Sequence, residues 1–228
     1  MSSTRRYLPA VLAMTLIVVA SNVLVQFPVG GSIGSLQLAD ILTWGAFTYP
    51  FSFLVTDLTN RRFGPRIARR VVLVGFLAAV VCSIVVPKLL FSLGLMDFAT
   101  AADRLMRIAL ASGCAFLAAQ LLDITIFNGL RRQAWWRAPV ISSVAGTVVD
   151  TAIFFTISFA PAFAFLGPND DFSLGTAPLF GVLSVETVRW VSWALGDLGI
   201  KLVIAALALV PYRIIMQALM PYPVPARS

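Results

Sequence analysis

The sequence predicts an all-α integral membrane protein with six transmembrane helices. Of its 228 residues, 59% are hydrophobic and only 12% are charged, and the mean hydropathy is +0.91. A soluble domain keeps about a quarter of its residues charged, so this surface is expected to meet lipid. No polar stretch is long enough for a separate soluble domain. We therefore expect one transmembrane domain over residues 1–228.

Six apolar stretches are long enough to cross a bilayer, which takes about 20 helical residues. The second contains Pro50 and the sixth carries charged residues, but both remain long and apolar enough to span. The first follows Arg5 and Arg6 and is longer than a signal-peptide core, so we expect it to stay on the protein. The six ranges are 8–27, 38–58, 71–91, 107–130, 138–160 and 186–217.

The distribution of basic residues predicts the orientation, because cytoplasmic loops are rich in Lys and Arg. With an internal N-terminus, the outer segments hold only Lys88, Arg104 and Arg107. The inner segments hold Arg5, Arg6, Arg61, Arg62, Arg66, Arg69, Arg70, Arg131, Arg132, Arg137, Arg213 and Arg227. Both termini are therefore expected in the cytoplasm.

The composition argues against several classes of function. The net charge of +7 lies in short clusters between apolar runs, which membrane topology explains better than nucleic-acid binding. There is no histidine, and Cys82 and Cys114 lie within apolar runs. We therefore expect no disulfide, no metal, no cofactor and no ordinary general base.

Four carboxylates fall well inside predicted spans, Asp57, Asp123, Asp150 and Asp197, whereas Asp40 and Glu186 lie near outer ends. One unpaired charge at mid-membrane costs about 2.5–3.5 kcal/mol, so such groups pair, take up a proton or face a wet cavity. Lys201 is four residues from Asp197, which favours mutual neutralisation.

The other three carboxylates are less easily neutralised. Asp57 could pair with Arg61 or Arg62, whereas Asp123 and Asp150 have no cation within one helical turn. We expect Asp123 and Asp150 to be functional.

Helical spacing puts polar and aromatic residues on shared faces, because residues three or four apart are neighbours. These faces predict a polar, aromatic pocket between the second, fourth, fifth and sixth spans. The stripes are Asp57 with Asn60; Gln120 with Asp123 and Phe127; Ser143 with Thr147, Asp150 and Phe154; and Arg189 with Trp193, Asp197 and Lys201.

Four segments resemble the vitamin uptake transporter family, whose best-understood members are the queuosine precursor transporters of bacterial inner membranes. They are TDLTNRRFG (56–64), AQLLDITIF (119–127), SSVAGTVVDTAIF (142–154) and GDLGIK (196–201). The resemblance implies uptake of 7-cyano-7-deazaguanine and 7-aminomethyl-7-deazaguanine, the free-base precursors of a modified tRNA nucleoside. It also implies a fold similar to the substrate-binding subunits of energy-coupling factor importers.

The candidate residues suit such a base. A deazaguanine presents an N–H beside an exocyclic amine, and one carboxylate can accept both hydrogen bonds. An amide can read the adjacent carbonyl, and an aromatic ring can stack on the heterocycle. We expect Asp123 and Asp150 to hold polar edges of the base. The predicted substrate-binding residues are Asp57, Asn60, Gln120, Asp123, Phe127, Asp150, Phe154, Trp193 and Lys201.

Three alternatives stay open from the sequence. One is a binding subunit that needs an ATP-driven module, although Ala10, Ala13 and Ala20 lack the partner alanine four residues on that such subunits carry. Another is a transporter of a different purine or vitamin-like solute. An intramembrane aspartyl protease is disfavoured because residues 194–197 read Ala-Leu-Gly-Asp rather than Gly-x-Gly-Asp. The expected partners are the lipid bilayer and a small-molecule substrate, and a homodimer is left open.

Overall fold

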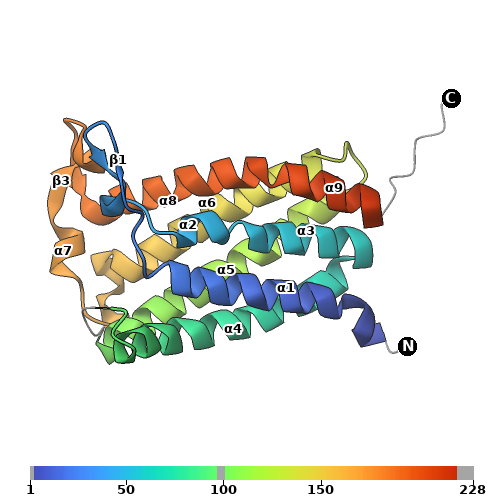
Figure 1. Cartoon of the computed structure of the whole chain (residues 1–228), viewed down its shortest axis with the longest axis horizontal. Helices are drawn as coiled ribbons and strands as arrows, with labels where there is room; N and C mark the ends of the chain where they lie inside the picture. The colour runs from blue at the N-terminus through green and yellow to red at the C-terminus, as the bar shows by residue number, and fades with distance from the viewer. Residues whose placement is uncertain (1–2, 97–100, 220–228) are drawn as a thin grey trace.

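The structure, a computed structural model, is a bundle of long helices lying side by side (Figure 1). It describes residues 3–96 and 101–219. Within these residues, five helical stretches are long and apolar enough to cross a membrane, with α8 and α9 counted together. The long helices are α1 (Ser3–Leu24), α4 (Pro65–Ser92), α5 (Ala102–Leu130), α6 (Arg137–Phe159) and α8 (Arg189–Leu207), which continues into α9 (Leu209–Leu219).

The stretch expected as a second span is not one helix. A small hairpin precedes it, its first part contains a 3₁₀ turn, and its second part is helical on both sides of Pro50, which has no N–H to donate. With 13 residues, α3 rises only about 20 Å, less than the roughly 30 Å of a hydrocarbon core. The elements are β1 (Ser32–Ile33), β2 (Leu36–Gln37), η1 (Leu38–Asp40), α2 (Gly45–Thr48) and α3 (Phe51–Phe63).

The two ends of the bundle differ (Figure 1). One end, here the hairpin end, carries β1–β2 and a second hairpin formed after α6. The opposite end, here the terminus end, contains the start of α1 and the end of α9. The elements between α6 and α8 are η2 (Pro161–Leu166), α7 (Asp171–Leu174), β3 (Thr176–Pro178), η3 (Leu179–Gly181) and β4 (Glu186–Val188).

The predicted inner arginines gather at the terminus end. The junction of α3 and α4 holds Arg61, Arg62 and Arg66, and the junction of α5 and α6 holds Arg131 and Arg132. Both junctions lie at the same end as the start of α1 (Figure 1). Arg227, also predicted on the inner side, lies outside the described residues.

Arg107, predicted in an outer segment, is buried to 1% exposure and ties down the end of α6. Its guanidinium donates to the carbonyls of Ile157 (2.8 Å) and Ala160 (2.7 Å) and to that of Gly167 (3.0 Å). These carbonyls end a helix or begin a loop, where backbone N–H groups are scarce, although that of Ala160 also accepts from the backbone N–H of Phe163. One cation therefore holds the chain as it turns from α6 into η2.

Small residues let the helices approach closely. A Cβ at Gly75 would lie 2.7 Å from Met14 Cγ, and a Cβ at Gly146 would lie 2.6 Å from Phe53 Cε1. Such contacts drive helix association in lipid, where apolar side chains gain little from burial. Gly146 thus lets α6 pack closely against Phe53 of α3.

Candidate functional site

A cavity of about 420 Å³ lies in the half of the bundle nearer the hairpin end. The end of α1, residues 39–49 and parts of α4, α5, α6 and α8 line it. Its volume falls in the range of small-molecule binding sites. Residues 38–44 do not continue the helices α2 and α3, and residues 39–43 line the cavity together with Gly45, Ala46 and Tyr49.

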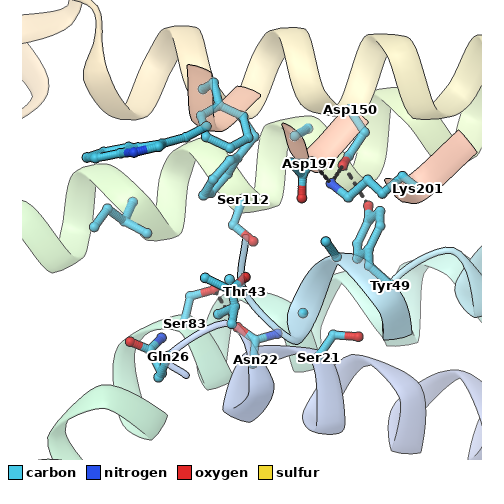
Figure 2. Close-up of a pocket in the computed structure, with 18 of the residues that line it drawn as sticks. Ser21, Asn22, Gln26, Thr43, Tyr49, Ser83, Ser112, Asp150, Asp197 and Lys201 are labelled. Atoms are coloured by element: carbon cyan, nitrogen blue, oxygen red, sulfur yellow. Dashed lines mark hydrogen bonds and ion pairs between the residues drawn. The ribbon is translucent and has the colours of Figure 1, made fainter. Parts of the chain in front are cut away.

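One wall of the cavity is ionic (Figure 2). Lys201 Nζ lies 2.6 Å from Asp197 Oδ2 and 3.0 Å from Asp150 Oδ2. The Tyr49 hydroxyl donates to the second oxygen of Asp150 at 2.7 Å, and the Lys201 ammonium sits 4.8 Å from the centre of the Tyr49 ring. Thr151 donates to Asp197 Oδ2 at 3.1 Å. Two carboxylates share one ammonium here, which leaves one excess negative charge when all three are ionised.

The predicted pairing of Asp197 with Lys201 is confirmed. Asp150 has no cation within one turn of its own helix, but α8 packs beside α6 and brings the same ammonium to both carboxylates. Helical spacing reveals partners on one helix only, so it could not detect this contact.

The wall across the cavity carries amide and hydroxyl groups (Figure 2). Ser83 donates to Asn22 Oδ1 at 3.0 Å, and Asn22 Nδ2 donates to the Val18 carbonyl at 2.9 Å. Ser112 and Thr43 also line the cavity. A ligand bridging the two walls would meet a carboxylate pair on one side and amide and hydroxyl groups on the other.

Aromatic rings line the part of the cavity towards the hairpin end. Phe159 meets Trp193 edge-on at 5.5 Å between ring centres, and Phe154 meets Phe155 at 5.2 Å. Trp193 also stacks on Phe172 of α7 at 6.2 Å. Flat rings beside hydrogen-bonding groups favour a flat polar ligand.

The structure divides the nine predicted residues into two sets. Asp150, Phe154, Trp193 and Lys201 line the cavity. The five that do not are Asp57, Asn60, Gln120, Asp123 and Phe127, and all five are buried in the half nearer the terminus end.

The expectation that Asp123 and Asp150 face one chamber is therefore wrong. On α5 the cavity lining runs from Leu105 to Phe116. Asp123 lies seven residues further along, about 10 Å towards the terminus end.

Each residue of the second set has neighbours inside the bundle. Gln120 accepts from Thr56 (2.5 Å) and donates to Ser52 (2.9 Å), both on α3. Asn60 donates to the Ile124 carbonyl at 3.1 Å. The remaining neighbours are Ser142 and Ser143, which donate to Asp57 at 3.3 Å each, and Arg61, whose guanidinium lies 5.1 Å from the Phe127 ring centre.

Sequence reasoning missed Tyr49 and Asn22. Asn22 is an amide inside an otherwise apolar predicted span, a signal that could have been read as functional. Tyr49 precedes Pro50 in the interrupted second span, and nothing in its spacing shows that it reaches Asp150 on α6. The alternative that Asp57 pairs with Arg61 or Arg62 is not observed, because in the described part of the chain its hydrogen bonds come from serines.

Comparison with known proteins places these residues in context. Residues 43–216 match the model of a family described as a vitamin uptake transporter. The chain is 40% identical over 148 residues to the queuosine precursor transporter of Escherichia coli (strain K12), covering 63% of this chain and 64% of that protein. It is 38% identical over 153 residues to a protein of Haemophilus influenzae named "Probable queuosine precursor transporter", covering 63% and 65%. The matches thus span just under two thirds of these relatives' length. No solved structure matches the chain.

Proposed function

Because this chain belongs to the vitamin uptake transporter family, we propose that it takes up free-base queuosine precursors across the membrane. The chain is a multi-pass protein of the bacterial inner membrane, and its family consists of transporters rather than enzymes. The proposed substrates are 7-cyano-7-deazaguanine and 7-aminomethyl-7-deazaguanine. The names of the related proteins and the chemistry of the cavity support this proposal.

The proposed topology has six crossings and both termini in the cytoplasm. Residues 38–63, which include α2 and α3, would form one further crossing, the second in chain order, beside the five long helical stretches. An even number of crossings agrees with the start of α1 and the end of α9 lying at the same, arginine-rich end (Figure 1). The cavity then faces the outside, ready to receive substrate. Single-chain substrate-binding subunits of energy-coupling factor importers would share this arrangement.

The observation that carries the proposal is Asp150, fixed in the cavity wall between Tyr49 and Lys201. A carboxylate held in this way can accept the N–H and exocyclic amine of a guanine-like edge together. Phe154 and Trp193 line the same cavity and offer faces for stacking. The excess negative charge of Asp150, Asp197 and Lys201 suits the cationic aminomethyl form, since charge-assisted hydrogen bonds are about twice as strong as neutral ones.

The predicted substrate contacts of Asp57, Asn60, Gln120, Asp123 and Phe127 stay predictions. A base leaving the cavity for the cytoplasm has to pass their half of the bundle. Contacts with them would form only in a conformation open to that side.

The test is the queuosine content of tRNA in a host that cannot make the precursor and lacks both its own transporter and any energy-coupling module. The wild-type chain is expected to restore queuosine from external base, whereas Asp150→Asn protein of equal abundance is not. Asp103→Asn is the matched control, because Asp103 is exposed and outside the cavity. Failure of the wild-type chain, or normal queuosine with Asp150→Asn, would contradict the proposal.

A further inference from the structure

Asp57 and Asp123 form a second pair of carboxyl groups, away from the cavity. Asp57 is on α3 and Asp123 on α5, with exposed fractions of 2% and 0%. The groups are close enough for a hydrogen bond once one of them carries a proton. With both ionised, two acceptors would face each other with no hydrogen to share.

Nothing in the described part of the chain neutralises this pair. Its ion pairs are Arg104–Asp170, Lys201–Asp150 and Lys201–Asp197. Neither oxygen of Asp123 accepts a hydrogen bond in residues 3–96 and 101–219, and Asp57 accepts only from the hydroxyls of Ser142 and Ser143 on α6. A buried carboxylate without a partner is strongly disfavoured and takes up a proton instead.

The charged and titratable groups described around Asp57 and Asp123 form no ion pair with them. Arg61, one turn from Asp57 on α3, donates to the Tyr212 hydroxyl of α9 and to the Arg131 carbonyl, and its Nη2 has no partner in the described residues, so it makes no contact with Asp57 there. On α8, Lys201 is already shared by Asp150 and Asp197. Tyr212, Asp57 and Ser143 line a hollow of about 10 Å³, close to the size that one water needs. A proton thus has a polar place to enter or leave beside Asp57.

We propose that Asp57 and Asp123 together bind one transported proton, and that its release to the cytoplasm accompanies each substrate molecule. The coupling of proton release to substrate uptake rests on the proposed function, whereas the proton site itself does not. One carboxylate oxygen forms an O–H bond with a proton taken from water on the outside. The same bond breaks, and the proton returns to water, when the terminus end opens. The pair lies between the cavity and the terminus end, so opening that end must expose it.

The first experiment tests the proton site without substrate. The infrared spectrum of purified wild-type protein at neutral pH is expected to contain the carbonyl absorption of a protonated carboxyl group. The double variant Asp57→Asn, Asp123→Asn, which has no carboxyl group here, should lose it. Asp103→Asn, on the same helix as Asp123, should keep it. Absence of the band in wild type, or its persistence in the double variant, would overturn the proposal.

The second experiment tests the coupling in proteoliposomes with the membrane potential held at zero and 7-cyano-7-deazaguanine as the uncharged probe. An outside that is more acidic by one pH unit should raise wild-type accumulation about tenfold for one proton per base, since one unit is a factor of ten in the equilibrium. Asp123→Asn should bind the base normally from outside, because Asp123 does not line the cavity, but should accumulate none.

The outcomes separate the two proposals. Accumulation of the base that does not depend on the pH gradient, or that depends on a sodium gradient, would overturn proton coupling. Loss of base binding in folded Asp123→Asn protein would overturn it as well. No uptake under any gradient would contradict the proposed function, while the infrared result would still decide the proton site.

Discussion

The ammonium group of Lys201 lies 3.0 Å from a carboxylate oxygen of Asp150, although the two residues are 51 positions apart. The same ammonium lies 2.6 Å from Asp197, one turn earlier on α8. The side chain of Lys201 is only 7% exposed, so the contacts are poorly screened by solvent. Lys201 therefore fixes α8 against α6 and sets the positions of both cavity carboxylates.

Replacing Lys201 by methionine should destabilise the protein. Breaking a buried ion pair from one side costs about 3–5 kcal/mol, because the remaining charge has no partner, and here two carboxylates are left. Thermal unfolding in detergent should show a clear loss of stability. Lys88→Met is the control, since Lys88 is exposed and outside the cavity. Equal melting temperatures for both variants would show that the buried contacts do not stabilise the fold.

Replacing Asp197 by asparagine should change the preference between the two bases. The substitution removes the excess negative charge of the cluster of Asp150, Asp197 and Lys201 and leaves Lys201 paired with Asp150. Affinity for the cationic 7-aminomethyl form should fall about tenfold, a loss of about 1.4 kcal/mol. Affinity for the neutral 7-cyano form should change by less than about threefold.

Calorimetric titration of the purified protein with each base measures this preference. Asp103→Asn, which alters a carboxylate outside the cavity, should leave both affinities unchanged. Equal losses of affinity for the two bases would mean that Asp197 interacts with the ring system they share rather than with the charge of the aminomethyl group.

The long helices could be predicted because lipid imposes length and hydropathy on each crossing. The fifth predicted span, 138–160, corresponds to α6 at Arg137–Phe159. The interrupted second span could not be predicted in the same way. Its first part, residues 38–44, is apolar enough for a helix, but backbone hydrogen bonds hold it against the end of α1, as from Trp44 to Phe27.

The candidate site could be predicted only in part, for a geometric reason. Spacing identifies residues that share a face of one helix, such as Asp197 and Lys201. It gives neither the rotation of one helix against another nor their relative heights. Asp123 and Asp150 thus looked equivalent in the sequence, yet one faces Asp57 and the other lines the cavity.

A substitution of Gln120 tests whether the predicted residues that do not line the cavity contact a substrate that enters from the outside. Its side-chain amide joins Ser52 and Thr56 across the α3–α5 contact, and it is fully buried. Gln120→Ala should therefore lower the free energy of unfolding by about 2 kcal/mol, because buried hydroxyls lose partners. Affinity for the base should stay within about twofold of wild type, since Gln120 does not line the cavity.

Chemical unfolding and binding, measured on the same preparation, separate these effects. Gln37→Ala, on the exposed strand β2, should change neither quantity. A loss of affinity well above twofold in folded Gln120→Ala protein would place the amide in direct contact with the base.

Trp193 tests the stacking of the base. It lines the cavity and is held by Phe159 and Phe172, so its ring is fixed before substrate arrives. Stacking of a base on an aromatic side chain is worth about 1–3 kcal/mol, and Trp193→Ala should weaken binding of both precursors about tenfold or more. Trp193→Phe should recover most of the affinity, because it keeps a flat ring. Trp136→Ala is the matched control: Trp136 is 43% exposed and stacks with Arg137 at the terminus end. Unchanged affinity in Trp193→Ala would show that the heterocycle does not stack on Trp193. Phe154 would then be the remaining predicted residue that lines the cavity and could stack on the base.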